Sequence, residues 1–120
     1  ILMRRNERVG IDLEYMSSNI SALAFKFINK NEKITREKAL RKRHLYLHWC
    51  AKEAIYKICD KEGIIIRRDI TIEPFEVQDS GIINGRVKNA RLNEAFVLYY
   101  AIYNNYAIVW TRQNYEIDSI

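Results

Sequence analysis

The chain has 120 residues and a formal net charge of +5, with 48% hydrophobic and 29% charged residues. This composition predicts a single compact globular domain and excludes a disordered or repetitive chain, and no apolar run approaches the roughly 18 residues of a membrane helix. The positive charge fits several acidic partners, namely nucleic acid, an anionic membrane, a phosphorylated ligand or an acidic protein.

The first predicted element is a strand from Val9 to Glu14. Apolar and polar residues alternate along it, which predicts one buried face and one acidic face. The buried face would carry Val9, Ile11 and Leu13, and the acidic face would carry Asp12 and Glu14.

Two helices are predicted next. A short helix would begin near Asn19 or Ser21, and a long helix would run from about Thr35 to Lys61. The long helix has an apolar stripe at spacings of three, four and seven residues. Its members are Leu40, Leu47, Ala51, Ala54, Ile55 and Ile58.

The last part of the chain is predicted to form strands. Phe96 to Tyr103 and Tyr106 to Thr111 flank Asn104 and Asn105, which suit a two-residue hairpin turn because Asn tolerates positive φ. The order of one strand, two helices and then a meander of strands predicts an α+β fold over residues 1–120. We expect the helices to pack on one face of a mainly antiparallel sheet.

The two cysteines, Cys50 and Cys59, both lie in the predicted long helix. They cannot form a disulfide there, since the two Cα atoms would have to lie within about 7 Å. Free thiols fit a reducing compartment such as the cytoplasm.

Asp12 and Glu14 stand two residues apart on the predicted strand, so their side chains leave the same face with Cα atoms roughly 6.5 Å apart. Two carboxylates placed in this way could share one hard cation such as Mg²⁺. A solvated outer face of an edge strand is the simpler alternative.

On the long helix, Trp49, Glu53 and Lys57 are spaced by four residues and line one face. Glu53 could complete a metal site with Asp12 and Glu14 or act as a base, and Lys57 and Lys52 could bind phosphate. The simpler alternative is a surface Glu–Lys pair beside a half-buried tryptophan.

Taken together, the two segments resemble the paired signature of the 4'-phosphopantetheinyl transferase superfamily. That signature is G-I-D-x-E followed by W-x-x-K-E-A-x-x-K, and this chain has every fixed position, from Gly10 to Glu14 and from Trp49 to Lys57. The D-x-E form and Trp49 are more similar to the surfactin-synthetase-activating branch than to the short holo-acyl-carrier-protein synthases.

The resemblance implies a reaction in which the phosphopantetheine arm of coenzyme A moves to a serine of an acyl or peptidyl carrier protein. Adenosine 3',5'-bisphosphate would be released. By the same resemblance Asp12, Glu14 and Glu53 would hold Mg²⁺, and Glu53 or a metal-bound water would deprotonate the serine. Lys57 would stabilise or protonate the leaving phosphate, and Lys52 would be a further phosphate contact.

The chain departs from the surfactin-type pattern upstream of the first motif. That type has two similar halves, with a Ser-His pair that helps to hold the nucleotide. Nine residues precede Gly10 here, and none is Ser or His. Ile1 to Met3 already resemble a strand, so we expect either the C-terminal half of a longer protein or a chain that assembles with itself.

Three other features leave alternatives open. Arg41 to His44 form a basic run that suits either a solvated helix face or docking of an acidic carrier protein or coenzyme A. His44 and His48 have a zinc-compatible spacing without a third ligand, and the tyrosines of the final hairpin suit cross-strand packing better than base stacking.

A degenerate transferase half or a nucleic-acid-binding module is the competing function. The acidic strand argues against the second, because carboxylates repel phosphate.

Overall fold

The computed structural model describes residues 2–17, 19–59 and 63–119. Side chains are described for residues 8–17, 19–59 and 63–113. The elements in chain order are β1 (Leu2–Tyr15), α1 (Ile20–Leu23), η1 (Ala24–Lys26, a 3-10 helix), α2 (Lys38–Ile58), α3 (Ile66–Asp69), β2 (Ile70–Ile72), β3 (Ser80–Lys88), β4 (Asn93–Tyr103) and β5 (Tyr106–Ser119).

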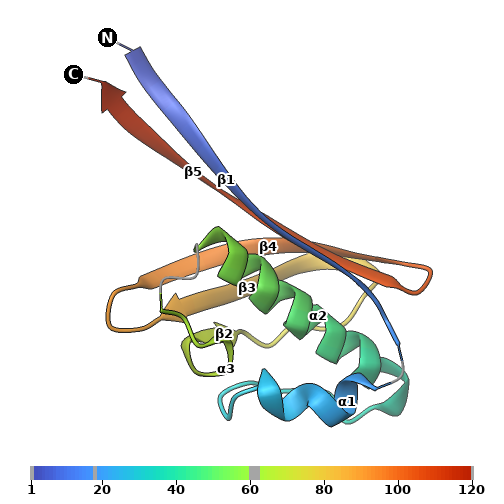
Figure 1. Ribbon diagram of the computed structural model, residues 1–120. Coiled ribbons are helices and arrows are strands. Elements are labelled where there is room, and N and C mark those ends of the chain that lie inside the picture. The colour runs from blue at the N-terminus through green and yellow to red at the C-terminus, as the bar shows by residue number, and fades with distance from the viewer. Residues whose placement is uncertain (1, 18, 60–62, 120) are drawn as a thin grey trace.

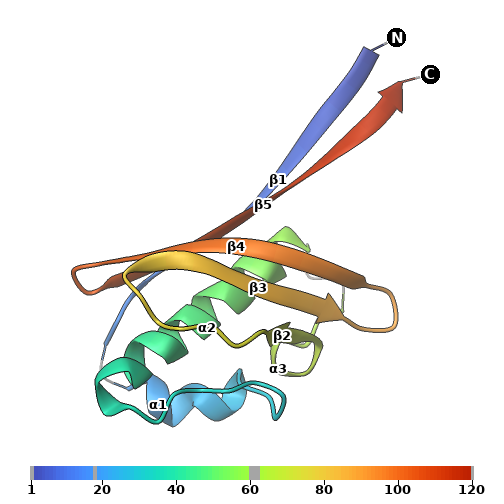
Figure 2. The same ribbon diagram turned by 180° about the vertical axis from the view of Figure 1, so that it is seen from behind.

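The described strands form one sheet in the order β1-β5-β4-β3-β2, and every neighbouring pair is antiparallel. Helix α2 lies across one face of this sheet, and α1 and α3 lie on the same side (Figures 1 and 2). The strands β1 and β5 pair along their whole length and project together beyond the rest of the domain (Figure 1). The predicted α+β fold with helices on one face of an antiparallel sheet is therefore confirmed.

The core lies between α2 and the sheet. The predicted stripe of α2 is correct, because its members from Leu47 to Ile58 are buried and only Leu40 is half-buried. They pack against sheet residues that include Ile83, Leu98 and Val109, all without exposed surface. Burial of this apolar surface is the main force that fixes the helix on the sheet.

The ends of α2 differ from the prediction. The helix begins at Lys38, with Glu37 as N-cap, while Thr35 instead accepts a hydrogen bond from the Glu37 backbone N–H at 3.2 Å. It ends at Ile58, and the predicted end near Lys61 lies outside the described residues. The hairpin turn was predicted correctly, since Asn104 adopts a φ of 54° between β4 and β5.

The two faces of β1 are the reverse of the prediction. Asp12 faces α2 and is buried, whereas Ile11 and Leu13 on the opposite side are 47% and 57% exposed. Gly10 gives the physical reason. A Cβ atom at this position would lie 2.1 Å from the backbone oxygen of Ala54, so β1 contacts α2 through the face that carries Gly10.

The side of the sheet that faces away from α2 is consequently apolar and open to solvent. Cross-strand rows on this outer face align Ile11 with Trp110 and Trp110 with Tyr99, whose rings stack with centroids 6.1 Å apart. We call this surface the outer face. Its large exposed residues are Val9, Ile11, Leu13, Tyr15, Ile82, Val97, Tyr99, Tyr103 and Tyr106.

Candidate functional site

Three carboxylates approach the contact between β1 and α2, and we call Asp12, Glu14 and Glu53 the acidic site. Asp12 and Glu14 leave the same face of β1 because they are two residues apart on a strand. Asp12 is 9% exposed, and Glu14 and Glu53 are half-buried. The structure thus turns the acidic residues of β1 toward the helix that carries Glu53.

The ammonium of Lys57 lies within this site. Its Nζ donates hydrogen bonds of 2.9 Å to Asp12 Oδ1 and 2.9 Å to the backbone oxygen of Ile11. The hydrogen bond with Asp12 raises the pKa of Lys57, and the negative charges of Asp12, Glu53 and Glu14 act in the same direction. One lysine is therefore coupled electrostatically to all three carboxylates.

Trp49 contacts the acidic site at Glu14, on the side away from Lys57. Its Nε1 donates to Glu14 Oε1 at 3.3 Å, and its ring lies 5.3 Å from the ring of Phe27. The spacing of four residues places Trp49, Glu53 and Lys57 on the helix face that meets β1. The structure therefore brings four of the five residues predicted for the site to one contact, with Trp49 beside them. The four are Asp12, Glu14, Glu53 and Lys57.

The fifth predicted site residue, Lys52, does not join them. Its side chain has no exposed surface, and its Nζ donates to the backbone oxygen of Phe27 and to Glu32 Oε1, the latter at 2.7 Å. Burial lowers the pKa of Lys52, and the Glu32 carboxylate opposes that effect. The predicted phosphate contact of Lys52 is not supported, because its ammonium is enclosed by protein.

Glu32, which no sequence motif singled out, anchors this buried pair. Its two carboxylate oxygens also accept hydrogen bonds from the backbone N–H groups of Asn29 at 2.9 Å and Ile72 at 2.8 Å. We call Lys52, Glu32 and these backbone partners the buried clasp. It joins α2 to the segment after η1 and to β2.

Asp12 gives the test of whether a metal ion fits the acidic site. Its Oδ2 is buried and has no hydrogen-bond partner among the described residues. Carboxylate oxygens are the ligands that Mg²⁺ prefers, so an unsatisfied buried carboxylate oxygen fits such an ion. Within the described part of the chain, however, no three His, Cys, Asp or Glu side chains are gathered closely enough to hold a metal. The donor chemistry fits a cation, while the three ligands are not preassembled.

Cys50 lies on the buried side of this site. Burial raises the pKa of its thiol, and the neighbouring Asp12 carboxylate raises it further. A thiol in this environment stays protonated, so Cys50 is not a candidate nucleophile. The described structure also leaves Cys50 and Cys59 as free thiols, as predicted.

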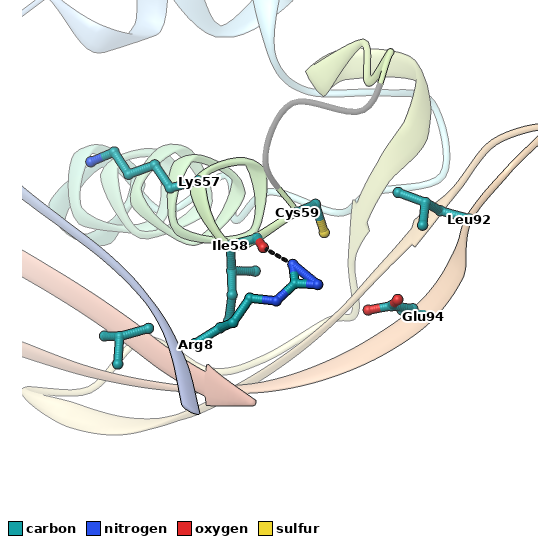
Figure 3. A pocket seen from close by; sticks show the side chains of 7 residues that line it. Arg8, Lys57, Ile58, Cys59, Leu92 and Glu94 are labelled. Carbon is teal, nitrogen blue, oxygen red and sulfur yellow. Dashed lines mark hydrogen bonds between the residues drawn. The ribbon is translucent and has the colours of Figure 1, made fainter. Parts of the chain in front are cut away.

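Two cavities flank the acidic site along β1. One, of about 550 Å³, is lined by Lys57, Arg8, Glu94 and Cys59 among others, and Arg8 donates to the Ile58 backbone oxygen at 2.7 Å (Figure 3). The other, of about 290 Å³, is mostly apolar; its lining consists of Glu14, Tyr15, Ile20, Leu23, Lys26, Phe27, Tyr46 and Trp49. A ligand held at the acidic site thus has room to extend in both directions.

The two histidines of α2 are buried and do not form a metal site with a third ligand among the described residues. His44 Nδ1 accepts the Thr35 backbone N–H at 3.0 Å, and His48 Nδ1 lies 3.0 Å from the His44 backbone oxygen. Both rings pack against Phe75. Their role is therefore packing in the core, as the sequence favoured for His48.

Comparison with known proteins identifies the family of this chain. The model of the 4'-phosphopantetheinyl transferase superfamily matches residues 8–111, which include the whole acidic site, α2 and most of the sheet. A search of curated proteins gives no match. Within the described residues, no helix is both long and apolar enough to cross a membrane. The chain therefore belongs to the 4'-phosphopantetheinyl transferase superfamily.

Proposed function

We propose that this chain moves the 4'-phosphopantetheine arm of coenzyme A to a serine hydroxyl of an acyl or peptidyl carrier protein in a Mg²⁺-dependent reaction. Family membership supports phosphopantetheine transfer in general. The observation that supports the specific site is the meeting of Asp12, Glu14, Glu53 and Lys57 at one contact between β1 and α2. Three negative charges and one mobile positive charge suit a substrate that is itself a pyrophosphate bound with a cation.

The residues of the acidic site have separate tasks in this proposal. Asp12, Glu14 and Glu53 would hold the cation, for which the unsatisfied Oδ2 of Asp12 is the best-placed ligand. The cation would neutralise charge on the pyrophosphate oxygens and orient them. Lys52 has no part in the chemistry and keeps α2 in place through the buried clasp.

The bond changes are those of an in-line displacement at phosphorus. The serine oxygen forms a bond to the phosphorus that carries the pantetheine arm, and the bond from that phosphorus to the bridging oxygen breaks. The serine proton goes to a base, which is either the Glu53 carboxylate or a water molecule held by the cation. The bridging oxygen leaves on adenosine 3',5'-bisphosphate, and the Lys57 ammonium stabilises its negative charge.

Carrier loading tests the proposal. Asp12→Asn keeps the size of the side chain and removes its charge, so we expect the loading rate to fall by at least about 100-fold. Glu73→Gln is the matched control, because Glu73 is exposed and lies in the loop after β2. Intact mass of the carrier protein measures the added arm. Loading by Asp12→Asn at the rate of Glu73→Gln would refute the assignment of the site.

The outer face supports a further part of the proposal, which concerns self-association. A cluster of large exposed apolar side chains is typical of a surface that contacts another protein. We propose that a second copy of the chain covers this face. Ile11→Asp with Tyr99→Asp would then convert a self-associated wild type to a monomer in analytical ultracentrifugation. A wild type that sediments as a monomer at tens of micromolar would refute this part alone.

A further inference from the structure

The Lys57 ammonium spans the gap between α2 and β1. It contacts both a side-chain oxygen of Asp12 and the backbone oxygen of Ile11, each at 2.9 Å. The Lys57 side chain is 47% exposed and the Asp12 side chain 11% exposed. The carboxylate is therefore fixed within the protein, while the lysine reaches it from the solvent side on a flexible stem.

The two oxygens of Asp12 are not equivalent. Oδ1 is occupied by Lys57, and Oδ2 is buried without a hydrogen-bond partner among the described residues. A charged oxygen in that position is costly unless a donor or a cation can reach it. The Lys57 ammonium thus satisfies one of the two carboxylate oxygens of Asp12 and leaves the other for a further ligand.

An ammonium and a divalent cation at one carboxylate would repel each other. At contact distances in a partly buried site, this repulsion is much larger than the attraction of an exposed ion pair. Of the two cations, Lys57 is the one that can leave at little cost, because its side chain is half exposed and has four rotatable bonds.

We propose that Lys57 is the resident counter-ion of the acidic site and exchanges with a divalent cation at Asp12. Cation binding releases the ammonium from β1, and the released ammonium is then available to a phosphate group. Lys57 therefore offsets the negative charge of Asp12 before the cation arrives, and its ammonium becomes free to act only after the cation has bound. This inference rests on the proposed function for the identity of the cation and deepens it by giving Lys57 two positions.

Lysine reactivity tests the exchange directly and without substrate. The wild-type protein is given a short pulse of an amine-acylating reagent with and without Mg²⁺, and labelled lysines are read by peptide mass spectrometry. We expect labelling of Lys57 to rise several-fold with Mg²⁺, while exposed Lys38 stays constant and buried Lys52 stays protected. Unchanged or reduced labelling of Lys57 at saturating Mg²⁺ would overturn the exchange.

Cation affinity gives a second, independent test by isothermal titration with Mg²⁺ alone. Lys57→Met removes the competitor, so we expect Mg²⁺ to bind about five- to tenfold more tightly than to wild type. Lys38→Met is the matched control with the same charge change on the same helix, and its affinity should stay within about twofold of wild type. Lys57→Arg keeps a cation at the site and should restore the wild-type affinity.

The outcomes separate this inference from the proposed function. If Asp12→Asn abolishes Mg²⁺ binding but Lys57→Met binds no more tightly than Lys38→Met, the exchange is wrong and the cation site stands. If Asp12→Asn binds Mg²⁺ as wild type does, the cation site itself is wrong. If neither wild type nor Lys57→Met binds Mg²⁺, both are wrong.

Discussion

Two lysines on α2 show how differently one residue type can act within one helix. Lys52 lies in the buried clasp, where Glu32 and the Phe27 backbone enclose its ammonium. Lys57 lies at the acidic site, where it is half exposed and bonded to Asp12. A buried pair fixes the chain because breaking it leaves an unpaired charge, whereas an exposed pair can open and close at little cost. Burial therefore separates the structural lysine from the one available for chemistry.

The largest expected effect is on the buried clasp. Lys52→Met leaves the Glu32 carboxylate buried without its cation, so we expect the free energy of unfolding to fall by about 3–5 kcal/mol. Urea denaturation measures it. The double variant Lys52→Met with Glu32→Gln should recover part of this loss, because no charge then stays buried alone. A loss below about 1 kcal/mol in the single variant would show that the clasp is not structural.

Acid should have the next largest effect on stability, through the buried His48 of the same helix. Burial lowers the pKa of His48 to about 3, so the folded protein holds His48 neutral while the unfolded chain binds a proton near pH 6.5. The contribution of neutral His48 to the free energy of unfolding is fully present above about pH 6.5 and is lost as the pH falls from there toward about 3.

The free energy of unfolding should fall by at most about 1.4 kcal/mol per pH unit because of His48, which is the value for one proton bound on unfolding. Thermal melts of wild type and His48→Gln between pH 7.0 and 5.0 measure it. The variant should show a flatter dependence than wild type. Parallel curves would mean that His48 does not control acid sensitivity.

The smallest expected effect on stability is at the acidic site. Lys57→Met removes a half-exposed ammonium but leaves the buried Asp12 carboxylate without that donor, so the free energy of unfolding at pH 7 should fall by about 1 kcal/mol. The contribution of this pair has the opposite pH dependence to that of His48. Since the pKa of Lys57 is raised in the folded state, its contribution is complete below the ordinary value and is lost as the pH rises through the higher folded pKa.

Much of the acidic site could be predicted from the sequence. Strand alternation places Asp12 and Glu14 on one face, and helical spacing places Trp49, Glu53 and Lys57 on another. These rules are local, and the structure brings the two faces together. The antiparallel sheet and the Asn104 turn follow from equally local patterns.

The errors concern contacts between distant segments. Alternation along β1 shows that two faces exist but does not say which one meets α2. The close approach of Gly10 to Ala54 decides that, and no local pattern reveals it. The role of Lys52 depends on Glu32, which lies in a polar segment between two lysines and becomes buried only when that segment packs on α2. Spacing therefore predicted which residues share a face, and long-range packing determined the environment of each face.

Carrier loading by Lys57→Met, compared with Lys52→Met, tests the division between the two lysines most directly. Rates are measured with coenzyme A and Mg²⁺ at a temperature where both variants are folded, and each is divided by the folded fraction. We predict that Lys57→Met loses at least about 100-fold in rate with a much smaller loss of stability than Lys52→Met, while folded Lys52→Met stays within about tenfold of wild type. Loading by Lys57→Met close to the wild-type rate, or a larger loss in folded Lys52→Met, would contradict the account.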